Sequence, residues 1–208
     1  GRSLIAMGLT NPNGQLYGID WFGDMRHRGY EGWTLEETKF FGFLYGKPLS
    51  DYANHILRQA RLDPNEFLLN LNGGFCGFVH LKDRIIVFND RFGYGKIYLS
   101  ESPEGVVVGS SFNEIVRRLT QKTPDLVGIL EFLRFGFPLY DLTYLKEVRL
   151  LPPGSRLEID ISSGKPVLEN RYWQYEFVEG LTANREKMYN QLWENLEAAV
   201  EDRSEEHT

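Results

Sequence analysis

Cysteine is almost absent from this sequence of 208 residues, and its one cysteine is Cys76. A single cysteine excludes an internal disulfide, and no basic segment followed by an apolar segment opens the sequence. We therefore expect a reducing, cytoplasmic setting. The four histidines have no metal-ligand spacing with this cysteine, so we expect no metal site.

Long apolar runs and basic clusters are lacking as well. No apolar run approaches the roughly 20 residues that a membrane-spanning helix needs. The formal net charge is -6, and the longest basic cluster is the short segment at residues 25–28. Nucleic acids and anionic membranes attract such an acidic chain only through a concentrated basic patch. We expect no nucleic-acid partner and no membrane partner.

Apolar residues, in contrast, make up 42% of the chain, which is enough for the core of one large domain. Residues 75–81 and 85–88 are apolar at nearly every position, and a charged turn separates them. This pattern predicts a buried antiparallel hairpin that is covered on both faces. The glycines near residue 93 then fall in a hairpin turn rather than between a strand and a helix, so no phosphate or dinucleotide loop is predicted.

The rest of the chain predicts a mixture of strands and helices. Strands are expected at residues 4–9, 15–22, 39–45 and 105–109. Four helices are expected: one at residues 53–60, a short one that begins at residue 63, a short one that ends at residue 119, and one at residues 123–135. Ser50, Asp63 and Asn113 are the predicted N-caps, and Thr123-Pro124 is the predicted start of the last of these helices. Gly136 is its predicted stop.

A long helix is predicted from about Ala183 to Asp202. Its apolar residues recur every three to four positions and are Met188, Leu192, Trp193, Leu196 and Val200. We expect part of this stripe to pack on the sheets of its own domain and the rest to face a partner.

Several segments resemble one known family. LNGGF at residues 71–75 is similar to the motif "LNGMFAFA", and NDRFG at residues 89–93, continued by KIYL, is similar to "RDRFGIKPLYY". LEFLRFG, KEVRLLPPG and RYW, which end at residues 136, 154 and 173, resemble "YLRFG", "KGIKKLPPG" and "RYW". These are motifs of the class II glutamine amidotransferase domain in the asparagine synthetase and β-lactam synthetase family.

The resemblance implies an α+β fold of the N-terminal nucleophile hydrolase type, a four-layer α/β/β/α sandwich of two antiparallel sheets. It implies an amidotransferase-like domain at residues 1–182. Residues 183–208 would form a helix that leads to an ATP-pyrophosphatase (synthetase) domain, whose "SGGxDS" loop is not found in this sequence.

The resemblance also shows how far the catalytic site departs from the family. Ser3 aligns with the cysteine nucleophile, but Gly1 and Arg2 precede it, so its amino group is not free to act as the base. The segment at residues 40–45 aligns with "FNGEIY", and Phe41 stands where the oxyanion-hole asparagine is expected. We find no counterpart of the arginine that binds the glutamine carboxylate.

Two vestigial substrate-binding residues remain. Gly42 matches the glycine of the oxyanion hole, and Asp51 matches the aspartate that binds the glutamine amino group, although Asp51 also suits a carboxylate in the first turn of a helix. His27, in a loop similar to the family's "HRGPD", is expected to be structural. Cys76 is expected to be a buried, unreactive small side chain.

These observations predict a domain that resembles glutamine-hydrolysing asparagine synthase but has no catalytic residue for glutaminase activity. Its role would be a scaffold for the downstream synthetase domain of the same protein, with a homodimer possible. No cofactor is expected in this chain, and ATP and Mg²⁺ are expected only for the synthetase domain. Two alternatives stay open: an amide hydrolase that uses Ser3 after processing, and a free-standing ligand-binding module with the aromatic residues 40–45 along its groove.

Overall fold

The structure is a computed structural model that describes residues 5–10, 16–21, 31–35, 38–44, 63–71, 74–102, 105–177 and 185–204. The strands are β1 (Ile5–Thr10), β2 (Leu16–Trp21), β3 (Glu31–Leu35), β4 (Thr38–Leu44), β5 (Phe75–His80), β6 (Arg84–Asn89), β7 (Tyr98–Ser102), β8 (Gly105–Gly109), β9 (Arg149–Leu150), β10 (Ser155–Asp160) and β11 (Pro166–Arg171). The helices are α2 (Pro64–Asn70), α3 (Phe112–Arg118), α4 (Leu126–Phe135) and α5 (Arg185–Ser204).

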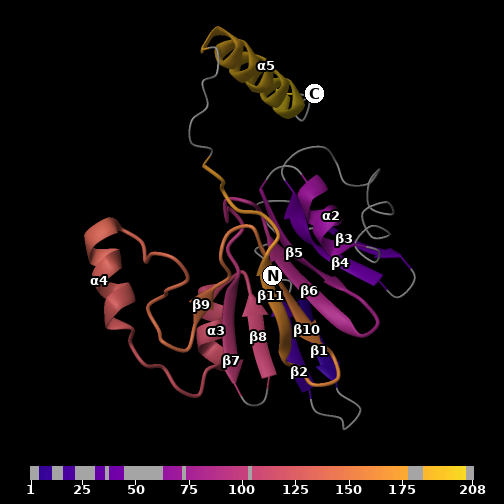
Figure 1. Cartoon of the computed structure of the whole chain (residues 1–208). Helices are drawn as coiled ribbons and strands as arrows, with labels where there is room; N and C mark the ends of the chain where they lie inside the picture. Colours follow the sequence, from indigo (N-terminus) through magenta and orange to yellow (C-terminus); the bar gives the residue numbers. More distant parts are fainter. Residues whose placement is uncertain are drawn as a thin grey trace.

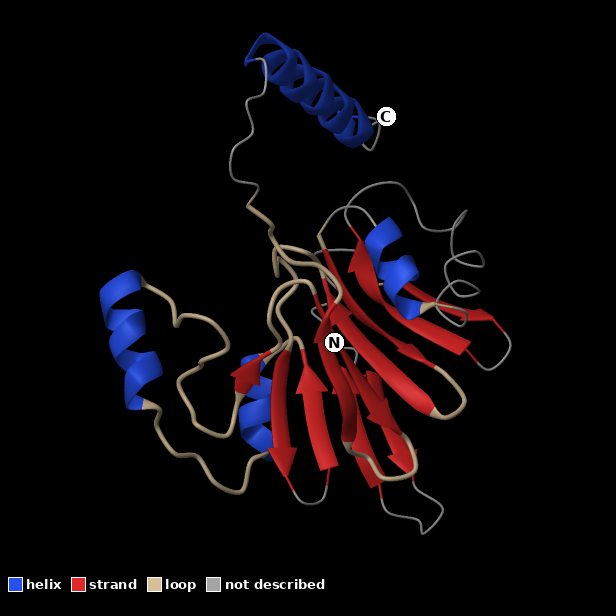
Figure 2. Cartoon of the chain, in the orientation of Figure 1, coloured by secondary structure: helices blue, strands red, loops and turns tan. Residues whose placement is uncertain are grey.

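The hairpin of β5 and β6 lies at the centre of the largest sheet. β5 pairs antiparallel with β6, and the sheet runs in the order β11-β10-β6-β5-β4-β3 (Figure 1). A second layer contains the sheet β8-β7-β9 and the hairpin of β1 and β2, in which β2 lies beside β8 (Figure 2). The predicted central hairpin and the predicted opening hairpin are both confirmed.

Buried side chains cover both faces of the central hairpin. One cluster joins β5, β6 and β10 to the smaller sheet and contains Cys76, Phe78, Ile85, Val87, Ile97, Leu99, Val106, Val108, Leu151, Leu157 and Ile159. The other joins the opposite face to α2 and contains Phe67, Leu68, Leu71, Phe75, Val79, Leu81, Ile86 and Phe88. Successive side chains of a strand point to opposite faces, so a run that is apolar at every position fits a sheet covered twice. The structure is therefore α+β with antiparallel sheets, as predicted.

Two helix starts differ from the prediction. The N-cap of α3 is Ser111 rather than Asn113, and α4 begins at Leu126 behind Asp125 rather than at Thr123. The Asp125 carboxylate accepts hydrogen bonds from the amides of Val127 and Gly128, whereas Pro124 forms a β-bridge with Leu145. Asparagine, serine and aspartate are almost equally good N-caps, so propensity alone does not choose among neighbouring candidates, and Ser111 makes no side-chain capping bond.

The other caps behave as expected. The Asp63 carboxylate caps α2 by accepting from the amides of Asn65 at 2.8 Å and Glu66 at 3.2 Å. Gly136 ends α4 with a φ of 84°, a left-handed conformation that glycine adopts at little cost. The helix predicted behind Ser50 lies outside the described residues.

Five strands were not predicted: β3, β7, β9, β10 and β11. The sequence of β10, Ser-Arg-Leu-Glu-Ile-Asp, alternates polar and apolar residues, which is a strand signal. β3 and β11 lie at the two edges of the six-stranded sheet and carry few large apolar residues. Edge strands bury less surface, so their sequence signal is weak.

The long helix α5 is confirmed, but its predicted packing on the sheets is wrong. All of its described side chains, residues 185–201, are exposed, and Figure 1 shows the helix apart from the sheets. Trp193 is 61% exposed and donates from Nε1 to the Glu197 carboxylate at 2.7 Å. Across the described residues, no helix is both long and apolar enough to cross a membrane.

Candidate functional site

The loop after β6 is organised by the carboxylate of Asp90. Its Oδ2 accepts hydrogen bonds from the amides of Phe75 at 3.3 Å and Gly95 at 2.8 Å. Its Oδ1 accepts from the amides of Phe92 at 3.0 Å and Tyr94 at 3.1 Å. Asp90 is buried, and its oxygens are occupied by backbone donors. It therefore acts as a structural anchor rather than as a proton acceptor for a substrate.

The backbone of Asp90 adds to this anchor. Its N–H donates to the Phe75 carbonyl, and its carbonyl accepts from the amides of Gly93 and Gly154. Gly93 has a φ of 65°, and a Cβ on Gly95 would lie 2.6 Å from the Cβ of Cys76. Both glycines are thus required by geometry, one by a left-handed backbone and the other by close approach.

Asn89, the neighbour of Asp90, ties the end of β6 to the turn before β10. Its Nδ2 donates to the carbonyls of Leu151 and Pro152, both at 3.0 Å, and its Oδ1 accepts from the Ser155 amide at 3.0 Å. The Tyr172 hydroxyl donates to the Asn89 carbonyl at 2.7 Å. Burial, and secondarily the Asp90 carboxylate, raises the pKa of Tyr172, so this hydroxyl keeps its proton.

Three segments that carry the family resemblance therefore meet at one place. The Gly154 carbonyl accepts from the amides of Tyr172 and Trp173, and the Trp173 ring packs edge-on against Phe92 with centroids 5.4 Å apart. The segments at residues 89–95, 151–154 and 172–173 are far apart in the sequence but share one hydrogen-bonded centre. The sequence predicted the segments but not their convergence.

Cys76 is not a nucleophile in this structure. It is 1% exposed and is the second residue of β5, where it pairs with Phe43 on β4 and Asn89 on β6. Burial is the main cause that raises the pKa of its thiol, and the Asp90 carboxylate raises it further. The predicted burial of Cys76 is therefore confirmed, and its low reactivity, which a buried and neutral thiol favours, stays a prediction.

Gly42 is the one predicted site residue within the described segments. It lies in β4 and pairs with Gly77 on β5 and Glu31 on β3, while its neighbour Phe41 pairs with Phe78. A glycine opposite a glycine removes two side chains from one position of the sheet, which permits close approach of a backbone or ligand. Ser3, Asp51 and His27 lie outside the described residues.

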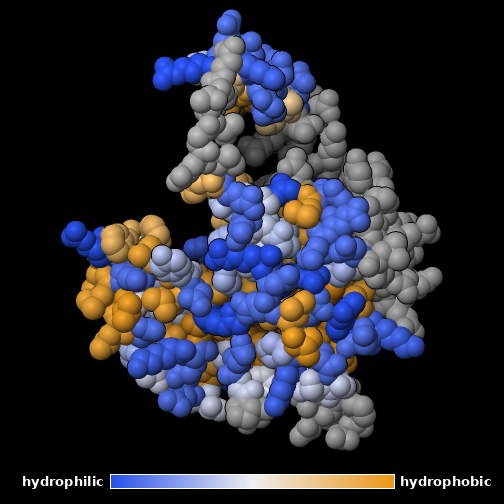
Figure 3. Space-filling model, in the orientation of Figure 1, coloured by the Kyte–Doolittle hydropathy of each residue, from blue (hydrophilic) through white to orange (hydrophobic). Residues whose placement is uncertain are grey.

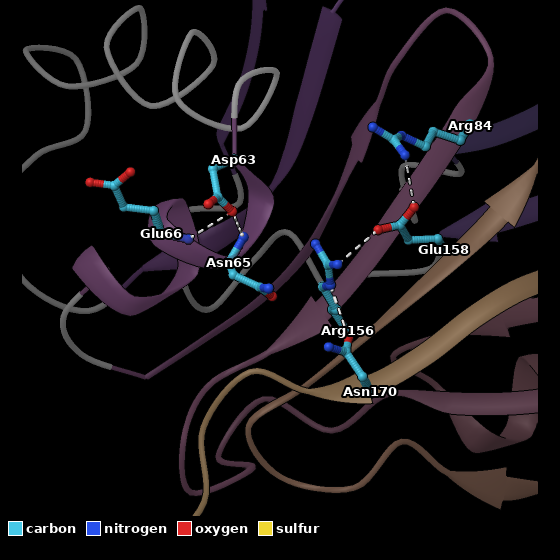
Figure 4. A network of polar contacts seen from close by, with 7 residues as sticks. All are labelled: Asp63, Asn65, Glu66, Arg84, Arg156, Glu158 and Asn170. Atoms are coloured by element: carbon cyan, nitrogen blue, oxygen red, sulfur yellow. Dashed lines mark hydrogen bonds and ion pairs between the residues drawn. The ribbon is translucent and has the colours of Figure 1, made fainter.

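A polar network that was not predicted from the sequence connects β6, β10 and β11 (Figure 4). Glu158 forms ion pairs with Arg84 at 3.1 Å and Arg156 at 3.2 Å, and Arg156 Nε donates to Asn170 at 2.9 Å. Alternation along β10 places Arg156 and Glu158 on the same face, and that signal was available in the sequence. The network joins three strands, and its carboxylate is held by two guanidinium groups.

Metal-ligating side chains do not gather in the part of the chain that the structure describes. No group of three or more histidine, cysteine, aspartate or glutamate residues there could hold an ion. What the described geometry supplies is a rigid loop centre at Asp90 and a sheet position without side chains at Gly42 and Gly77.

No family model and no curated protein matches this chain. Among solved structures, the chain is similar to glutamine phosphoribosylpyrophosphate (PRPP) amidotransferase from B. subtilis complexed with ADP and GMP. The match has a TM-score of 0.38 and 13% identity, and it covers 71% of this chain and 32% of that chain. At that identity and TM-score the match transfers no residue role, so the function is inferred from the residues themselves.

Proposed function

We propose that this chain is a glutamine-amidotransferase-like domain that does not hydrolyse glutamine and serves as a scaffold for an ATP-dependent amide-forming domain of the same protein. The observation that carries the proposal is the meeting of the motif segments around Asp90. The carboxylate, the two glycines and the Asn89 amide all have structural roles there. A domain that serves only as a scaffold needs the contacts that hold its fold together, and the contacts around Asp90 are of that kind.

The residues for catalysis do not accompany that centre. Phe41 stands where the motif "FNGEIY" has its asparagine, and phenylalanine has no side-chain donor for an oxyanion. Loss of one oxyanion-hole donor typically costs about 10² to 10³ in rate, and loss of a nucleophile costs on the order of 10⁶. Cys76 cannot replace the nucleophile, because it is buried and its thiol is neutral.

A scaffold function places the chemistry outside the described residues. The downstream domain would bind ATP and Mg²⁺ and form the amide, and ammonia or a substrate amine would supply the nitrogen. The present domain would contribute stability and contact surface. Its own buried thiol and saturated Asp90 carboxylate would take no part in the reaction.

The test compares nitrogen donors in the longer protein. Amide formation should proceed with ammonia or an amine and should not rise when glutamine is added in its place. The matched variant is Phe41→Asn, which restores one donor and should leave glutamine unused, because the nucleophile is still missing. Glutamine-dependent amide formation at a rate comparable with that from ammonia would contradict the proposal.

A further inference from the structure

A buried group of charged side chains lies between β6 and β10, on the side of the six-stranded sheet that packs against α2. Arg156 pairs with Phe88 and Glu158 pairs with Ile86 across the two strands, so the charged side chains share a face with these two core residues. Figure 3 shows hydrophilic side chains spread over the visible surface, where water solvates them. Arg156 and Glu158 are instead only 8% and 5% exposed.

The charges of this group do not balance among the described residues. Glu158 lies between two guanidinium groups, with ion pairs to Arg84 at 3.1 Å and to Arg156 at 3.2 Å (Figure 4). The Asp160 carboxylate, two residues further along β10, accepts instead from two serines of the turn that follows the strand. Two guanidinium groups and one carboxylate leave a surplus of one positive charge.

Arg156 also has donors that no described residue meets. Its Nε donates to the Asn170 side chain at 2.9 Å and its Nη2 pairs with Glu158. Its Nη1 and the Nε of Arg84 are buried and have no hydrogen-bond partner within the described part of the chain. Buried polar groups are nearly always paired, and arginine cannot lose its charge by releasing a proton. The cluster therefore calls for an anion.

An arginine at the surface of the same protein has the balance that Arg156 lacks. Arg149 pairs with Glu101 at 2.7 Å and with Glu169 at 2.6 Å, although its side chain is partly exposed to water. Arg156 is more deeply buried and shares one carboxylate with Arg84. Desolvation makes an unbalanced charge more costly in the interior than at the surface, so the buried arginine has the greater need of a second anion.

We propose that Arg156 and Arg84 form a binding site for a free carboxylate anion of a few atoms. A carboxylate carries one negative charge, which equals the surplus, and its two oxygens accept from guanidinium N–H groups in the planar geometry that arginine favours. The burial of Arg156 admits only a small anion. The Arg84 side chain is 38% exposed and forms the solvent-facing end of the cluster. The proposal does not depend on the proposed function.

The experiment measures denaturant unfolding of the whole chain in increasing sodium formate, at an ionic strength held constant with the sodium salt of a bulky sulfonate. A ligand that binds only the folded state multiplies the folded-to-unfolded ratio by one plus the ratio of its concentration to its Kd. We expect this curve, with a rise of about elevenfold at about ten times the Kd. A general salt effect would instead change the free energy of unfolding linearly with concentration.

Three variants locate the effect. Arg156→Met removes the surplus charge and leaves Glu158 paired with Arg84, so this variant should fold and lose the formate effect. Arg84→Met also removes the surplus and should raise the Kd for formate at least about tenfold, which keeps the test decisive if Arg156→Met does not fold. Arg149→Met is the matched control, because Arg149 already has two carboxylates, and it should keep the wild-type formate effect.

Chloride tests the chemistry of the ligand. It carries the same charge as formate but has one acceptor atom, so it should stabilise the wild type less than formate at equal concentration. Equal stabilisation by the two anions would overturn the assignment of a carboxylate site. The absence of a formate effect in the wild type, a linear effect, or an effect that Arg156→Met and Arg84→Met both keep would overturn the site itself.

Discussion

The Asp90 carboxylate accepts hydrogen bonds from four backbone amides, those of residues 75, 92, 94 and 95. Asp90→Ala leaves several of these buried donors without an acceptor, so we expect it to lower the free energy of unfolding by about 3 to 5 kcal/mol. Asp83→Ala, on the exposed turn between β5 and β6, is the control and should change it by less than about 0.5 kcal/mol. Denaturant unfolding measures both. If the two variants lowered the free energy of unfolding equally, Asp90 would not be the anchor of this loop.

The thiol of Cys76 predicts a pH dependence of stability. The unfolded thiol ionises near its ordinary pKa of 9.0, whereas burial raises the pKa in the folded state. The folded state therefore binds the proton more tightly, and this contribution to stability is complete below pH 9 and is lost as the pH rises above it. The free energy of unfolding should fall by up to about 1.4 kcal/mol per pH unit there.

Cys76→Ala is the variant that isolates this effect. Both proteins should unfold cooperatively, and the alkaline slope between pH 9 and about 10, below the ordinary tyrosine pKa, should be shallower in the variant by most of that amount. Native-state labelling with a thiol reagent gives a second readout and should be slow. Identical slopes, or rapid labelling, would show that Cys76 is accessible and ionised.

At the scale of elements, α4 depends on two glycines for different reasons. A Cβ on Gly128 would collide with the Thr143 carbonyl oxygen, whereas a Cβ on Gly136 would meet nothing within 4 Å but would strain a left-handed backbone. Gly128→Ala should cost about 3 kcal/mol and loosen α4, and Gly136→Ala should cost about 1 kcal/mol. Hydrogen exchange of α4 amides and denaturant unfolding distinguish the two. A larger cost for Gly136→Ala would contradict the packing of α4.

Helix α5 should be dispensable for the fold of the described core. Its side chains at residues 185–201 are exposed, so ending the chain after residue 184 removes little buried apolar surface. We expect the midpoint of thermal unfolding to stay within about 4 °C, which corresponds to less than about 1 kcal/mol. Calorimetry of the full and shortened chains measures it. Loss of cooperative unfolding in the shortened chain would show that α5 belongs to the core.

The elements with strong periodicity were predictable, and those decided by neighbours were not. Residues 75–81 and 85–88 are apolar at almost every position, so a hairpin covered on both faces followed from the pattern. The start of α4 was misplaced because Pro124 suits a first helical turn as well as the β-bridge that it forms with Leu145. A bridge to a residue some 20 positions away leaves no local signal.

Across the whole molecule, features set by local sequence could be predicted, and contacts between distant segments could not. The similarity of residues 71–75, 89–93 and 146–154 to family motifs identified the segments that carry the family resemblance. The bonds of Asn89 to Leu151, Pro152 and Ser155 could not be read from the sequence, because they join segments more than 60 residues apart. The site prediction is only partly covered, since Ser3 and Asp51 lie outside the described residues and Gly42 is placed by its backbone pairing with Gly77.

We propose that this amidotransferase-like chain does not hydrolyse glutamine, and the most direct test is the release of glutamate from glutamine by the purified protein. We expect no release above the uncatalysed rate, because Phe41 aligns with the oxyanion-hole asparagine in the motif that the sequence resembles, and Cys76 is buried and neutral. Thermal unfolding in the same buffer should confirm that the protein is folded. Release of glutamate at more than about 1 s⁻¹, within the usual range of enzymes, would contradict the account.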